Sequence, residues 1–195
     1  MAKGSGHKPT LKISFNSPVV LTFALLCLAA LLLNGFTGGA ANRYVFSVYR
    51  SSLLDPLTYI RFFGHVLGHA NWAHYIGNMT LILLVGPLLE EKYGWSFILQ
   101  CILVTAFVTG LINFIFFPHV ALCGASGVAF AFILLSSFTS INDGTIPVTF
   151  ILIAIIYIGG EIYDGVFVAD NISQLTHVIG GIVGAFFGYV IARKH

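Results

Sequence analysis

Charged side chains are scarce in this chain of 195 residues, since Asp, Glu, Lys and Arg make up only 8% of it. Soluble globular proteins carry about 25%. Hydrophobic residues account for 57% of the sequence, and the mean hydropathy is +0.93. So few charges cannot cover the surface of a soluble domain, and disordered chains lack such an apolar content. The composition therefore predicts a polytopic membrane protein.

The sequence also lacks the patterns that mark several other protein classes. A net charge of +2 provides no basic surface for nucleic acid. Cys27, Cys101 and Cys123 are widely separated, which predicts buried thiols rather than a disulfide framework. Neither a Cys-x-x-Cys nor a His-Glu-x-x-His pattern occurs. No internal repeat is visible, which argues against a transporter built from inverted halves.

Long stretches without charge locate the membrane spans, each of which needs about 20 apolar residues. Asp, Glu, Lys and Arg are absent from the intervals 13–42, 62–89, 93–142, 144–160 and 171–192. The third interval is long enough for two helices and is broken at Pro118-His119 and again at 124–127. We therefore expect an all-α membrane protein with six transmembrane helices, the first from Pro18 to about Asn34.

One membrane domain is expected over residues 18–195. A short cytoplasmic segment, residues 1–17, precedes it, and the Gly-Ser-Gly-His stretch in this segment resembles a sequence added for protein expression. Six spans put both termini on one side, and the positive-inside rule makes that side the cytoplasm of a cell-membrane protein. The basic residues of that side are Lys3, Lys8, Lys12, Lys92, Arg193 and Lys194. A long first loop from Gly35 to about Ala73 holds the others, and we interpret it as a partly embedded structural cap.

Polar residues inside predicted spans are candidates for function, because hydrocarbon disfavours unpaired polar groups. Ser126 begins the fourth helix, His177 lies early in the sixth, and His74 and Asn78 share one face at the head of the second. The fourth helix ends near Phe138, so it covers only about 20 Å of a hydrocarbon core about 30 Å thick. Ser126 is therefore expected below the outer surface, at a depth similar to that of the other three.

Small residues predict that the fourth and sixth helices touch. They are Gly127 and Ala131 on the fourth helix, and Gly180, Gly184 and Gly188 on the sixth. Their contact would bring Ser126 and His177 within hydrogen-bond distance. A serine beside a histidine at a helix start offers a nucleophile, a general base and part of an oxyanion hole.

These motifs resemble those of the rhomboid intramembrane serine proteases. Gly124-Ala125-Ser126-Gly127 resembles the family's Gly-x-Ser-Gly motif, and His177-x-x-Gly180-x-x-x-Gly184 resembles its histidine-glycine motif on the last helix. The family's histidine-rich start of the second helix is matched by His65, His69, His74 and Asn78. The motif that closes this helix is matched by Gly86, Glu90 and Gly94. The resemblance extends from about Arg61 to the end of the chain.

The resemblance implies a dyad in which Ser126 is the nucleophile and His177 the general base. It implies an oxyanion hole formed by the Ser126 amide with the side chains of His74 and Asn78. The reaction would be hydrolysis of peptide bonds in the transmembrane or juxtamembrane segments of single-span membrane proteins, at a site open to the extracytoplasmic side of the lipid bilayer. The resemblance also implies that the reaction uses no metal and no organic cofactor. The sequence does not indicate the oligomeric state.

Three positions depart from the family pattern. The family's Trp-Arg pair in the first loop appears as Ile60-Arg61, and Lys92 stands where an arginine is frequent. Phe130 replaces a frequent tyrosine; it can stack on His177 but cannot donate a hydrogen bond.

Two alternatives fit the same residues. A catalytically inactive rhomboid-like protein would bind transmembrane segments without cutting them. A metal-dependent membrane protein could use His65 and His69, which are four residues apart, although Glu90 and Glu91 fall on the cytoplasmic side. Apart from that alternative, we interpret these two histidines as structural residues.

Two further expectations concern stability and access. Glu90, between Gly86 and Gly94, is expected to tie the second helix to a neighbouring loop. The fifth span, Pro147 to Gly160, is rich in β-branched residues, lacks a glycine stripe and ends in Gly159-Gly160. We interpret this span as a gate that moves to admit substrates.

Overall fold

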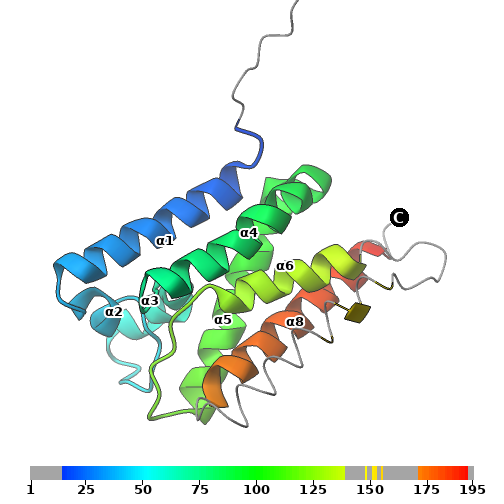
Figure 1. Cartoon of the computed structure of the whole chain (residues 1–195). Coiled ribbons are helices and arrows are strands. Elements are labelled where there is room, and N and C mark those ends of the chain that lie inside the picture. Colours follow the sequence, from blue (N-terminus) through cyan, green and yellow to red (C-terminus); the bar gives the residue numbers. More distant parts are fainter. Residues whose placement is uncertain (1–14, 139–147, 149–150, 153–154, 156–170, 193–195) are drawn as a thin grey trace, which may run out of the picture.

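The computed structural model describes residues 15–138, 148, 151–152, 155 and 171–192. Its described part is helical, apart from an isolated antiparallel bridge between Val48 and Leu122. Four helices follow one another side by side in the order α1, α4, α6 and α8, and α5 packs against α4, α6 and α8 (Figure 1).

Within the described residues, three helices are long and apolar enough to cross a membrane: α1 (Pro18–Phe36), α4 (Trp72–Tyr93) and α5 (Trp95–Phe116). Local signals in the sequence explain their ends. Pro18 opens α1, where its missing N–H costs nothing. Asn71 caps α4 by accepting a hydrogen bond from the His74 amide at 2.9 Å. Gly94, at φ +83°, makes the sharp turn between α4 and α5.

Two more helices fall where the charge-free intervals placed them. α6 runs from Ser126 to Phe138, and α8 from Asn171 to Ala192. The expected fifth span, from Pro147 to Gly160, lies outside the described residues apart from four isolated positions. The six-span architecture and the gate therefore remain predictions.

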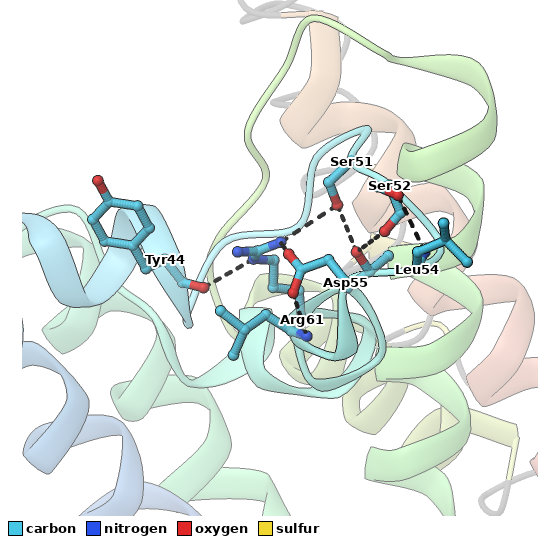
Figure 2. Close-up of polar contacts among 8 residues, drawn as sticks. Tyr44, Ser51, Ser52, Leu54, Asp55 and Arg61 are labelled. Carbon is cyan, nitrogen blue, oxygen red and sulfur yellow. Dashed lines mark hydrogen bonds and ion pairs between the residues drawn. The ribbon is translucent and has the colours of Figure 1, made fainter.

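The first loop is a folded unit that contains α2 (Ala40–Tyr44), α3 (Pro56–Gly64) and the 3₁₀ helix η1 (His65–Leu67). Arg61 holds this unit together from a buried position (Figure 2). Its Nε donates to the Tyr44 carbonyl at 2.9 Å, and Nη1 forms an ion pair with Asp55 at 3.2 Å. The guanidinium also lies 4.7 Å from the centre of the Tyr49 ring.

The loop also holds the segment that leads into α6. Val48 and Leu122 exchange two backbone hydrogen bonds of 2.9 Å. The Asn113 amide group on α5 donates to the carbonyls of Val48 and Val120 at 3.0 and 3.1 Å. Arg50 donates two hydrogen bonds of 2.7 Å to carbonyls in the last turn of α5. Irregular backbone before α6 thus has polar partners supplied by the protein, as a membrane setting requires.

Glu90 fixes the start of α1 against the end of α4. Its two carboxylate oxygens accept hydrogen bonds of 2.9 Å from the backbone amides of Val19 and Val20. The partner is therefore the first turn of a helix and not the loop expected from the sequence. A carboxylate suits this place because the first amides of a helix lack intrahelical acceptors and carry partial positive charge.

Glu90→Gln should lower the free energy of unfolding by roughly 1–3 kcal/mol, because the NH₂ group that replaces one carboxylate oxygen cannot accept a hydrogen bond and leaves one backbone amide without its acceptor. The matched control is Glu91→Gln, since Glu91 is the exposed neighbour on the same helix end. Thermal unfolding of both variants in detergent measures the difference. Equal midpoints for the two variants would contradict this role of Glu90.

The predicted contact between small residues of α6 and α8 is present. A Cβ atom on Gly180 would overlap the backbone of Gly127, and one on Gly184 would overlap the backbone of Ala131. α6 itself is a central element, with Val128, Phe132 and Leu135 fully buried. Glycine is therefore required on α8 for the two backbones to approach this closely.

Gly184→Ala should destabilise the protein by about 1–3 kcal/mol, the usual cost of overpacking, because the added methyl meets rigid backbone. Gly77→Ala on α4 is the control, since nothing lies within 4 Å of the added methyl. We expect that control to keep or raise stability, as alanine favours helix over glycine. Equal losses in both variants, measured by thermal unfolding, would show that close packing at Gly184 is not needed.

Candidate active site

Two of the predicted site residues, His74 and Ser126, lie close to Gly124. Its φ of +139° is a conformation that residues with side chains rarely adopt. A Cβ atom here would lie 2.8 Å from both Cε1 and Nε2 of His74 and 3.8 Å from Oγ of Ser126. The imidazole of His74 and the hydroxyl of Ser126 therefore face the same small region of backbone.

The first loop holds Gly124 in this position. The Gly124 amide donates a hydrogen bond of 2.9 Å to the His65 carbonyl in η1. Gly124 and Ala125 are both buried, and Ser126 is half-buried at the first position of α6. The first amides of a helix have no intrahelical acceptor, so this helix start can donate to a negatively charged oxygen.

His74 and Asn78 come from the first two turns of α4, where a spacing of four residues gives them a common face. Asn78 is buried, and its Nδ2 lies 3.2 Å from Nε2 of His69. Because Nδ1 of His69 lies 3.1 Å from the Leu67 carbonyl, that nitrogen carries the proton. Nε2 of His69 then accepts from Asn78 and leaves the second N–H of the Asn78 amide group for another acceptor.

The sequence predicts His69 to be a structural residue or, in the metal-dependent alternative, a metal ligand; the contact with Asn78 places its ring beside the site. Its ring centre lies 5.1 Å from that of His74 in an edge-to-face arrangement. Burial first, and then the nearby His74, lower the pKa of His69 to about 4. His69 is therefore neutral at pH 7, as its acceptor role requires.

The backbone of His177 lies on α8, three residues before Gly180, and its side chain lies outside the described residues. Because Gly180 packs on Gly127, this turn of α8 runs beside the first turn of α6. The ring of Phe130 lies against Gly181, one turn beyond His177. α8 is thus placed so that one of its turns passes close to Ser126.

The pair His65 and His69 does not have the geometry of the metal-dependent alternative. Nε2 of His65 lies 3.0 Å from the Ala106 carbonyl, while both ring nitrogens of His69 have the partners described above. The two rings thus serve separate hydrogen bonds. Among the described residues, no three His, Cys, Asp or Glu side chains gather in a group that could hold a metal ion.

Burial lowers the pKa of His65 from 6.5 to about 4, and the bond to the Ala106 carbonyl offsets this only in part. His65 therefore binds a proton more tightly in the unfolded chain than in the folded protein. The stability that neutral His65 contributes is therefore complete above pH 6.5 and decreases as the pH falls towards 4. We expect a slope of up to about 1.4 kcal/mol per pH unit from this residue.

Thermal unfolding in detergent between pH 7.5 and 5 measures that slope. His65→Phe should flatten the pH dependence, whatever it does to stability at pH 7.5. His119→Phe is the control, because His119 is exposed and its replacement should leave the slope unchanged. An unaltered slope in His65→Phe would show that the stability of the fold does not depend on the protonation of this residue.

Sequence reasoning missed the residues that support the site through the backbone. Asn113, Asn71 and the Val48–Leu122 bridge hold the loop before α6 and the start of α4. Only Asn71 has a sequence signal, since asparagine before an apolar helix is a typical cap.

The fold and this cluster define a helical membrane protein with a serine at the start of a short internal helix, facing a histidine from a neighbouring helix. Comparison with known families agrees with that description. The model of the Rhomboid domain matches residues 56–194. The chain belongs to the rhomboid family.

Relatives from three organisms show how far the similarity extends. The chain is 29% identical over 140 residues to Rhomboid-related protein 1 of Caenorhabditis elegans, covering 67% of this chain and 39% of that relative. It is 27% identical over 159 residues to Rhomboid-related protein 2 of Mus musculus, covering 71% and 53%. It is 24% identical over 140 residues to the chloroplastic Rhomboid-like protein 11 of Arabidopsis thaliana, covering 64% and 50%. The matched region thus spans about half or less of each relative.

Proposed function

We propose that this protein is an intramembrane serine endopeptidase that cleaves the transmembrane or juxtamembrane segments of single-span membrane proteins. The observation that carries the proposal is the meeting of Ser126 and His74 at Gly124, at the start of a helix packed by glycines on α8. A nucleophile, a side-chain donor and unpaired amides then face one region, which is what acyl transfer needs. Membership in the rhomboid family supports the same reaction.

In the proposed mechanism, His177 accepts the proton of the Ser126 hydroxyl while Oγ attacks the carbonyl carbon of the scissile peptide. The carbonyl oxygen becomes negatively charged and accepts hydrogen bonds from the Ser126 amide, His74 and Asn78. His177 then donates its proton to the leaving amine as the C–N bond breaks. A water molecule, activated by His177, hydrolyses the acyl-enzyme and restores Ser126.

His69 has a positioning role in this mechanism. By accepting one N–H of Asn78, it fixes the amide plane and directs the second N–H. The proposal includes a topology of six membrane-spanning helices with both termini in the cytoplasm. The active site opens to the extracytoplasmic side, from which water reaches the acyl-enzyme.

The proposal can be tested with the purified full chain in liposomes, together with a single-span substrate that carries a fluorescent tag. We expect cleavage that persists in the presence of chelators, and covalent labelling of Ser126 by an alkyl fluorophosphonate. Binding of the substrate without cleavage or labelling would favour the inactive binding protein instead. Cleavage that chelators abolish would favour a metal-dependent enzyme.

A further inference from the structure

An apolar cavity of about 830 Å³ lies between α1, the first loop and α5, away from Ser126. Its walls come from all three parts of the chain. Of the residues that line it, none is charged, and only Thr22 and Trp95 have polar side-chain atoms. The cavity extends from the start of α5 at Trp95 to α3 and η1, where Phe63 and Leu67 line it.

The cavity opens sideways from the protein. Leu26 on α1, Phe63 on α3 and Leu103 on α5 line it and are 50%, 43% and 43% exposed. α1 and α5 are both long enough to cross a membrane, so the opening between them faces lipid. The first loop lies between the two helices as well, since α2 and η1 contact α1, and α3 and η1 contact α5.

The size and chemistry of the cavity decide what can fill it. Buried water needs about two to four polar partners, and two polar side chains are too few for a cavity of this size. An empty apolar space, in turn, loses dispersion contacts along its walls. A transmembrane helix about 10 Å across would fill 830 Å³ with roughly 10 Å of its length, a third of the hydrocarbon core. The cavity therefore holds only a fraction of a membrane-spanning helix, whereas a flexible hydrocarbon chain is thin enough to enter.

We propose that this cavity is a binding site for one phospholipid acyl chain, which enters from the leaflet on the Trp95 side and ends beneath the first loop. The occupant is a resident lipid rather than a part of the exchanging lipid shell, because α1, α5 and the first loop enclose it on three sides.

The bound chain supports a part of the fold that also positions Gly124. Gly64, Val66 and Leu67 line the cavity, and they flank His65, whose carbonyl accepts the Gly124 amide. The lipid thus packs beneath η1 and stabilises the place where the first loop meets the segment before Ser126. The binding site itself does not depend on the proposed protease activity.

Retention of a brominated lipid tests this inference, because bromine quenches tryptophan and the chain has two tryptophans, Trp72 and Trp95. The full chain is reconstituted with phospholipids brominated along the acyl chains, and then extracted and washed in detergent. In Trp72→Phe, we expect Trp95 to stay quenched after washing. In Trp95→Phe, the remaining Trp72 should recover its fluorescence, because Trp72 does not line the cavity.

A cavity-filled variant provides the matched comparison. Thr22→Phe, Leu26→Phe and Leu103→Phe together fill the site, and the washed protein should lose the single phospholipid per chain that phosphorus analysis finds in the wild type. The control carries Thr80→Phe, Leu84→Phe and Leu88→Phe on the exposed face of α4 and should keep its lipid. If the cavity-filled variant does not fold, the comparison of Trp95 and Trp72 fluorescence still tests whether a lipid occupies the cavity.

Three results would overturn the proposal. One is recovery of Trp95 fluorescence on washing to the same extent as Trp72. The second is washed wild-type protein that contains no phospholipid. The third is a stable dimer in which Trp95 is shielded by a second copy instead of a lipid.

Discussion

Ser126→Ala is expected to abolish peptide cleavage while leaving the fold intact. The change removes one oxygen atom from a half-buried position at the start of α6, and alanine is a good helix former. Loss of the nucleophile in another serine hydrolase lowers kcat by roughly 10⁶-fold, and we expect a loss of that order here. Cleavage of a tagged transmembrane substrate in liposomes measures the rate, and thermal unfolding checks the fold.

His177→Ala should produce a loss of the same order, and the double variant should be little worse than either single variant. Nucleophile and base act as one unit, so that removing either already removes the covalent route. Additive losses in the double variant would mean that the two residues act independently. Equal turnover by the wild type and Ser126→Ala would end the protease proposal altogether.

His74→Ala and Asn78→Ala should each lower kcat by roughly 10²–10³-fold with little change in KM, as loss of an oxyanion donor does elsewhere. The reason is that the negative charge on the carbonyl oxygen develops only as the reaction proceeds, so that the ground-state complex gains little from these donors. Initial rates over a range of substrate-to-lipid ratios separate kcat from KM.

His119→Ala is the control for this pair, because His119 is exposed in the loop between α5 and α6 and lies outside the proposed machinery. His69→Gln adds a second comparison. A glutamine that can still accept from Asn78 should retain more activity than His69→Leu. If His74→Ala and Asn78→Ala kept a normal kcat and raised KM, these residues would position substrate instead of stabilising the oxyanion.

The helices that carry the site could be predicted because their signals are local. The charge-free interval 93–142, with its breaks at Pro118-His119 and at residues 124–127, was sufficient to locate α6 from Ser126 to Phe138. Small residues at four-residue spacing predicted the contact between α6 and α8. The position of His74 near Ser126 followed from helix direction and depth, before any contact was known.

The first loop could not be predicted in the same way, because its contacts join distant residues through irregular backbone. No periodicity links Arg61 to the Tyr44 carbonyl, or His69 to Asn78 across the start of α4. Glu90 was recognised as a structural carboxylate, but its partner, the start of α1, lies 70 residues away in the sequence. Such pairings depend on how the helices are arranged in space, and the residue pattern of a single segment carries no information on that arrangement.

The shortness of α6 has an electrostatic consequence. Its 13 residues span about 20 Å, less than a hydrocarbon core of about 30 Å, so in the proposed topology at least one end of this helix lies at the depth of that core. The Ser126 end follows the buried residues Gly124 and Ala125, so the partial positive charge of the helix dipole, about half an elementary charge, lies at a half-buried position and not on the open surface. Mobile ions screen buried charge far less than surface charge. The field that acts on a reacting carbonyl at this point is therefore a fixed property of the fold, nearly independent of the ionic strength outside.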